Sequence, residues 1–238
     1  MVKEKNNLFM LENLYNVRDL GQITTKFGTK TRRYKYIRGT AKGTMSDKEK
    51  KLTAYHEAGH AVVTYYLEGQ DPVHQVSIIP RGLAGGYTLH IPTEDKNYSS
   101  KSDMQNDLVV LLGGRVAEQI AIGDISTGAS NDIQRATKIA RDMVTRFGMS
   151  DNLGPVAFGS GSDEVFLGRD YSHMRNYSEE IASAIDGEVK NFISAAYDKT
   201  YSILTEHKDK LELVAQKLLE VEKIDAQQFA ELMGEATE

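Results

Sequence analysis

SDKEKKLTAYHEAGHAVVTYYLEG, residues 46–69, is the stretch around which the rest of the chain is arranged. It predicts one helix, because Ser46 and Glu49 have the spacing of a capping box, in which each side chain accepts the backbone amide of the other residue. Gly69 stands where a left-handed residue would end that helix. Apolar and small residues recur at the spacing of a helix face that packs on a core, namely Leu52, Tyr55, Gly59, Val63 and Tyr66.

Two histidines and a glutamate on this predicted helix have the spacing of a metal site. His56 and His60 are four residues apart, so both rings project from one side of a helix, one turn apart. Two imidazoles so placed can bind one zinc ion, and Glu57 can then hydrogen-bond a water on that ion. The alternative is an amphipathic helix that contains two histidines by chance. We favour the zinc site, because the motif lies within a well-capped helix.

The composition of the chain argues against several classes of protein and of metal site. The chain has 238 residues, of which 26% are charged and 40% hydrophobic, as in an ordinary soluble globular protein with a real core. A net charge of −5 without a dense basic cluster disfavours a nucleic-acid partner. No apolar run is long enough to span a bilayer, so we expect no membrane segment in this chain. Without cysteine, any metal must be held by His, Asp or Glu.

Residues 1–44 differ in composition from the rest of the chain, and we interpret residues 45–238 as a separate domain. The sequence NLYNVRDLG at residues 13–21, followed by Arg38-Gly39, resembles the leading segment of bacterial tyrosine-phosphatase-like proteins. Phosphatases of that type need a cysteine nucleophile. The chain contains no cysteine, so this activity is excluded and the segment is interpreted as a leader or fusion segment of unclear role.

Two strands are predicted, over residues 73–79 and 85–92. The second is stopped by Pro92 and is expected at a sheet edge, where proline is tolerated. An edge strand beside a metallopeptidase site can pair with an extended substrate backbone. The predicted substrate-binding residues are therefore Gly86, Tyr87, Thr88 and Leu89. His90 is a further candidate ligand, although a lone histidine in a strand is more often packed or exposed.

Two carboxylates are candidates for a third protein ligand. Glu118 lies in a helix predicted over residues 103–122, as a surface charge, a zinc ligand or a partner of a ligating histidine. Asp132 lies in the first turn of a helix predicted over residues 131–147 with Ser130 as its N-cap, where the helix dipole alone would favour a carboxylate. Spacing alone does not choose between the two carboxylates.

The remaining elements are predicted from caps and apolar periodicity. Asp103 is expected to cap the helix that contains Glu118. The Gly113-Gly114 pair in that helix costs about 1 kcal/mol per glycine relative to alanine, and it predicts the close approach of another backbone. Residues 151–175 are expected to form an irregular glycine-rich loop. Further helices are predicted over residues 178–207, 211–221 and 225–234, the last capped by Asp225.

Several separate blocks of the sequence, in order and spacing, resemble the peptidase domain of the FtsH family. The blocks are HEAGH at 56–60, VSIIPRG at 76–82, GGRVAE at 113–118 and STGASND at 126–132. The similarity continues through VFLGR at 165–169 to the C-terminal helices and covers about residues 45–238.

This resemblance implies a mainly α fold with a small β portion and carries family roles onto matching positions. His56, His60 and Asp132 match the zinc ligands, Glu57 matches the catalytic glutamate, and Glu118 matches a glutamate beside the metal rather than bound to it. The family consists of membrane-bound, ATP-dependent zinc proteases that act as hexamers. The resemblance therefore implies Zn²⁺, polypeptide substrates, a homo-hexamer, and a location in the cytoplasm or at the cytoplasmic face of the membrane.

The sequence departs from the family pattern in two places. It contains no membrane-spanning segment and no Gly-x-x-x-x-Gly-Lys-Ser/Thr loop of an ATPase module, so we do not expect ATP hydrolysis by this chain. Gly85 stands where the family has a larger apolar residue. We expect peptide hydrolysis by a zinc-activated water with Glu57 as general base. The alternative is a non-catalytic assembly module in which zinc only braces the helices.

Overall fold

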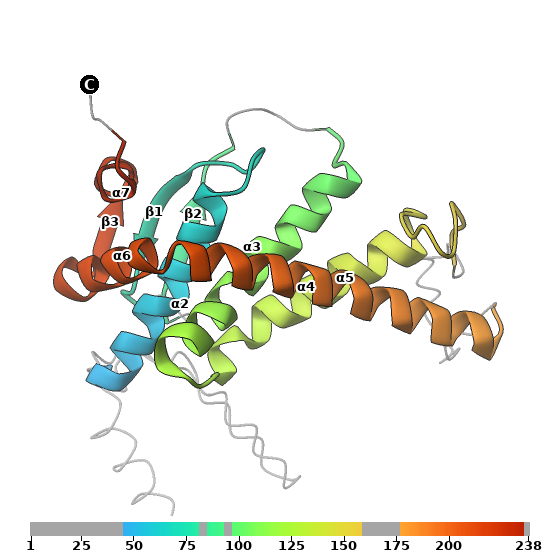
Figure 1. Cartoon of the computed structure of the whole chain (residues 1–238), viewed down its shortest axis with the longest axis horizontal. Helices are drawn as coiled ribbons and strands as arrows, with labels where there is room; N and C mark the ends of the chain where they lie inside the picture. Colours follow the sequence, from blue (N-terminus) through green and yellow to red (C-terminus); the bar gives the residue numbers. More distant parts are fainter. Residues whose placement is uncertain (1–44, 81–84, 93–96, 159–176, 236–238) are drawn as a thin grey trace, which may run out of the picture.

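A computed structural model describes residues 45–80, 85–92, 97–158 and 177–235 (Figure 1). Three features of the sequence lie wholly or mostly outside these residues. They are the leader at 1–44, the VFLGR block at 165–169 and most of the loop predicted at 151–175.

The described residues form helices around one small sheet, which confirms the mainly α fold with a small β portion. The helices are α2 (Asp47–Tyr65), α3 (Lys101–Ile122), α4 (Ser130–Thr145), α5 (Glu179–Glu206), α6 (Lys208–Val221) and α7 (Ala226–Met233). The strands are β1 (Val73–Ser77), β2 (Tyr87–His90) and β3 (Lys223–Asp225). In Figure 1, α5 and α6 extend one after the other across the other helices.

Helix α2 is buried along most of its length. All residues from Ala54 to Thr64 are buried, because α3, α6 and β1 pack against the helix. The buried stretch includes His56, Glu57 and His60. An unpaired polar group in such a place is costly, so each of these side chains must find a partner.

Two glycines allow α2 and α3 to approach each other closely. A Cβ added at Gly59 would lie 2.4 Å from the carbonyl oxygen of Gly113 and 2.5 Å from the Cβ of Ala117. A Cβ added at Gly113 would in turn lie 2.9 Å from the carbonyl oxygen of Gly59. These contacts confirm that the glycine pair of α3 marks the close approach of another backbone.

The three strands are antiparallel in the order β2-β1-β3, which places β2 at an edge of the sheet. Thr88 pairs with Val76 of β1, and Ile224 of β3 pairs with the same residue from the other side. Strand β3 was not predicted from the sequence. It has only three residues between two helices, and its pairing with β1 joins segments far apart in the chain.

The structure corrects the predicted end of the first helix. The capping box of Ser46 and Glu49 is present. Helix α2, however, ends at Tyr65, and its C-cap is Tyr66 rather than Gly69. Gly69 is left-handed, with φ of 78°, but it belongs to the turn after the helix. The early end accompanies a stacked contact between the rings of Tyr66 and His207, 3.5 Å between centroids.

Two predicted N-caps are also wrong. Helix α3 is capped by Ser100, whose hydroxyl accepts the amide of Asp103, while the Asp103 carboxylate completes the capping box. Ser130 is the first residue of α4 and not its cap, because a 3₁₀ turn at Thr127–Ala129 runs directly into the helix. The side-chain cap of that turn is Ser126, which accepts the amide of Gly128. Among the described helices, none has the length and hydropathy to cross a membrane.

Candidate metal centre

The two histidines of α2 are fixed by hydrogen bonds on one side of each ring. Nδ1 of His56 lies 2.8 Å from Oε1 of Glu118, and Nδ1 of His60 lies 2.8 Å from the carbonyl oxygen of Val110. Both partners are acceptors, so each Nδ1 carries the proton and donates it. In the neutral form of each ring, Nε2 then has a lone pair that can bind a metal, and such second contacts are typical of zinc-bound histidine.

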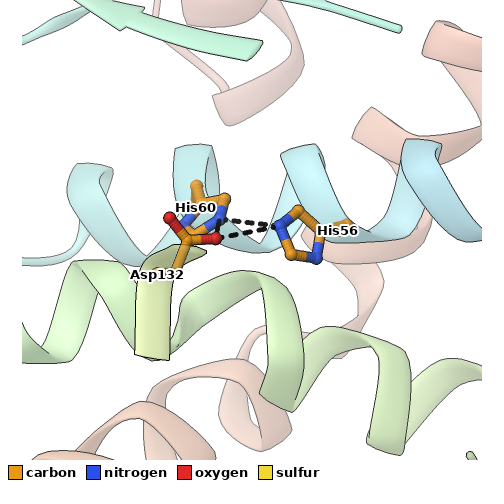
Figure 2. Close-up of side chains that lie close together, drawn as sticks. All are labelled: His56, His60 and Asp132. Carbon is orange, nitrogen blue, oxygen red and sulfur yellow. Dashed lines mark hydrogen bonds and ion pairs between the residues drawn. The ribbon is translucent and has the colours of Figure 1, made fainter. Parts of the chain in front are cut away.

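The free Nε2 atoms converge with one carboxylate oxygen (Figure 2). The two Nε2 atoms are 3.1 Å apart, and Oδ2 of Asp132 lies 3.3 Å from that of His56 and 3.5 Å from that of His60. Ligands about 2.0–2.1 Å from a tetrahedral zinc ion are separated by about 3.3–3.4 Å. Among the described residues these three side chains form the one group that could hold a metal, and their spacing fits zinc.

Asp132 reaches this point from a different helix. It lies in the first turn of α4, where the positive end of the helix dipole favours a carboxylate. The structure thus brings Asp132, rather than Glu118, to the donor group. His90 lies outside that group. Its Nδ1 is buried without a hydrogen-bond partner in the described structure, and burial lowers the pKa of its ring.

Glu118 supports two parts of the centre at once. It is fully buried, and besides His56 it accepts hydrogen bonds from the amide and the hydroxyl of Ser126, at 2.7 and 3.1 Å. Ser126 also caps the 3₁₀ turn that leads into α4 and hence to Asp132. Glu118 therefore fixes the His56 ring and the loop that delivers Asp132. The family resemblance placed Glu118 beside the metal. The sequence analysis gave no role to Ser126 or to the carbonyl of Val110, because neither lies in the His-Glu-x-x-His motif.

The centre has more negative than positive charge. Burial lowers the pKa of His56, but hydrogen bonds to Asp132 and Glu118 outweigh it and raise the pKa to about 9. Burial raises the pKa of Asp132, but hydrogen bonds from His56 and His60 bring it well below its usual range. In the described part of the chain, no lysine or arginine forms an ion pair with these carboxylates. A bound divalent cation would supply the missing positive charge.

Two glycines beside the centre leave space that the side chains of His56 and Glu57 occupy. A Cβ added at Gly114 of α3 would lie 2.4 Å from Cε1 of His56, so the ring occupies the space that a side chain would need. A Cβ added at Gly86 would similarly lie 2.9 Å from Oε1 of Glu57. Gly85, by contrast, would place a Cβ in ordinary contact, 3.5 Å from Oγ1 of Thr53. Position 85 therefore has room for a Cβ.

A buried helix that presents His-Glu-x-x-His to a carboxylate from a second helix defines a metallopeptidase domain. The sequence profile of Peptidase family M41 matches residues 43–232. The chain belongs to this peptidase family.

Similar proteins from several bacteria are named ATP-dependent zinc metalloprotease FtsH. The chain is 60% identical over 190 residues to an ATP-dependent zinc metalloprotease FtsH of Caldicellulosiruptor bescii, covering 80% of this chain and 31% of that protein. It is 60% identical over 185 residues to FtsH 2 of Alkaliphilus metalliredigens, covering 78% and 27%. It is 51% identical over 204 residues to FtsH of Bacillus subtilis, covering 84% and 32%. The chain spans about a third of the length of these curated relatives.

Proposed function

We propose that this chain is a zinc metalloendopeptidase in which His56, His60 and Asp132 hold the metal and Glu57 is the general base. One observation carries the proposal: three donor atoms lie 3.1–3.5 Å apart beside a buried glutamate. The relatives named as zinc metalloproteases support it. A site that only braces helices would not need a buried glutamate beside its three donors, which favours the enzyme over the non-catalytic module.

Each side chain of this centre has a separate role in peptide hydrolysis. When bound, zinc lowers the pKa of a coordinated water and polarises the scissile carbonyl. Glu57 accepts a proton from the attacking water and passes it to the leaving amine nitrogen. The hydrogen bonds of His56 and His60 to Glu118 and Val110 keep both rings oriented throughout.

Substrate would lie along the edge of β2 that no described strand occupies. We expect the backbone of Gly86, Tyr87, Thr88 and Leu89 to pair with an extended peptide, because β1 occupies only one edge of this strand. Inhibitory peptides with N-methyl groups at alternate backbone amides test this pairing. Two such series, methylated in opposite phase, should differ in affinity, because only one of them loses its hydrogen bonds. Equal affinities would contradict strand pairing.

The role of Glu57 is tested by Glu57→Gln in the full chain. We expect zinc content to stay at the wild-type level and kcat on a casein or peptide substrate to fall by about 10²–10⁴-fold, the usual contribution of a general base. Glu220→Gln is the matched control, because the Glu220 side chain is 68% exposed on α6, where it pairs with Lys217. Retained turnover in the Glu57 variant would refute the role.

The same experiment separates the enzyme from a non-catalytic assembly module. Full zinc occupancy in the wild type, without cleavage of any unfolded substrate, would favour the module. Assembly into hexamers, implied by the family, stays a prediction. Light scattering of the full chain in solution measures it.

A further inference from the structure

Strand β2 contacts the side chain of Glu57. Oγ1 of Thr88 lies 2.9 Å from Oε2 of Glu57 and 3.2 Å from the carbonyl oxygen of the same residue. The hydroxyl has one proton to donate. The carboxylate oxygen is the nearer of the two oxygens and the stronger acceptor, so it receives this proton. Thr88 therefore ties the head of the Glu57 side chain to the strand.

Gly86, the residue directly before β2, limits the same carboxylate. A Cβ built on Gly86 would point at Glu57, the residue that Thr88 contacts from within the strand. Gly86 is buried, and a Cβ there would lie 2.9 Å from Oε1 and Cγ of Glu57 and 2.7 Å from the carbonyl oxygen of Ser77, so Oε1 and that carbonyl occupy the space a side chain would need. The carboxylate is thus bounded by glycine at one oxygen and hydrogen-bonded by threonine at the other.

We propose that Thr88 is a positioning residue, which holds the Glu57 carboxylate in the orientation that proton transfer requires. The inference rests on the proposed function, in which Glu57 is the general base. A free glutamate side chain samples several rotamers, and a displacement of about 1 Å at a reacting group can cost about 10²-fold in rate. One hydrogen bond from Thr88 selects a single rotamer and leaves the remaining lone pairs of the carboxylate free for a water proton.

This arrangement links substrate binding to the orientation of the base. The backbone of β2 is the edge along which we expect the substrate to pair, and the Thr88 side chain contacts Glu57. The roles are separable, because the substrate would contact the main chain of the strand. Removal of the hydroxyl should therefore affect kcat and leave KM nearly unchanged.

The kinetic test compares Thr88→Val with Thr88→Ser in the full chain loaded with zinc. Valine keeps the shape of threonine without the hydroxyl, whereas serine keeps the hydroxyl. We expect kcat on a fluorogenic peptide to fall about 10- to 100-fold in the valine variant, with KM within about twofold, and to recover largely in the serine variant. Thr145→Val is the matched control, because the Thr145 hydroxyl donates to the carbonyl of Arg141 within α4.

A crystallographic comparison decides the same question without turnover. In the wild type Glu57 should occupy one conformer bonded to Thr88, and in Thr88→Val it should spread over several conformers. One unchanged conformer in both structures, or a kcat in Thr88→Val within about twofold of wild type, would overturn the inference. If the wild-type chain cleaves no substrate, the proposed function fails, whereas the two structures still decide whether Thr88 positions Glu57.

Discussion

At the scale of single residues, the buried carboxylate of Glu118 can be replaced by no other group without breaking a hydrogen bond. Its two oxygens accept three hydrogen bonds, one from His56 and two from Ser126. Burial raises the pKa of this carboxyl, but the hydrogen bond and charge of His56 and the Ser126 donors bring it below its usual value, so it stays ionised. Both oxygens of this buried carboxylate already accept hydrogen bonds. A donor group in place of either oxygen would leave a buried N–H or O–H unpaired, which costs free energy.

Glu118→Gln is therefore expected to weaken zinc binding. The amide group of glutamine keeps one acceptor oxygen, but its NH₂ group would face a donor of Ser126 or His56. Loss of such a supporting carboxylate costs about 10- to 100-fold in metal affinity. Competition with a chromophoric chelator measures it.

Glu188→Gln provides the matched comparison for that variant. Glu188 accepts a hydrogen bond of 2.6 Å from the buried Ser150, away from the metal donors. The substitution should leave zinc affinity unchanged. Equal zinc affinity in Glu118→Gln and wild type would show that Glu118 does not support the ligands.

At the scale of helices and strands, the contact between α2 and α3 depends on glycine. Gly59→Ala is expected to destabilise the chain, because the new Cβ would meet backbone at 2.4 Å and neither helix can move without disturbing His56 and His60. Overpacking of this kind costs about 1–3 kcal/mol, more than the roughly 1 kcal/mol that alanine adds in helix propensity. Urea unfolding monitored by circular dichroism measures the difference.

Gly187→Ala is the control for helix propensity alone. Gly187 lies within α5, and a Cβ there would have nothing within 4 Å. The free energy of unfolding should rise by about 0.5–1 kcal/mol. A similar rise in Gly59→Ala would mean that the two helices have room to separate.

The elements that carry the motif could be predicted because their signals are local. The capping box of α2, the four-residue spacing of the histidines and the β-branched run of β1 all lie within a few neighbouring residues. The features that could not be predicted depend on contacts between segments far apart in the sequence. Strand β3 exists only through its pairing with β1, and the end of α2 accompanies the stacking of Tyr66 on His207.

The site was predictable to the same extent and for the same reason. Helical periodicity placed His56, Glu57 and His60 together. Spacing could not choose between Asp132 and Glu118, because that choice depends on how α3 and α4 pack against α2. Resemblance supplied the answer, and the convergence of the three donors agrees with it. The contact of Thr88 with Glu57 has no sequence signal, since it joins a strand to a helix 31 residues away.

At the scale of the whole molecule, the metal is expected to contribute to the stability of the fold. The donors come from α2 and α4, and their supporting partners come from α3, so one ion would join three helices. Without it, the carboxylates of Glu57, Glu118 and Asp132 lie buried or half-buried around two imidazoles. A ligand that binds only the folded state stabilises it in proportion to the logarithm of its free concentration.

Removal of zinc should consequently lower the melting temperature of the full chain. At a free zinc concentration of about 100 times Kd, the linkage is worth about 2.7 kcal/mol. A domain of this size shifts by about 2–4 °C per kcal/mol, so a chelator should lower Tm by about 5–10 °C. Calorimetry before and after chelation, with zinc content measured in parallel, checks this value. Asp132→Asn should lose most of this Tm shift, because a neutral amide is a poorer third ligand. Asp142→Asn on the same helix is the control and should keep the shift, because Asp142 pairs with Lys138 and not with the metal donors. A zinc-loaded wild type whose Tm does not respond to chelation would contradict a role for the metal in joining the helices.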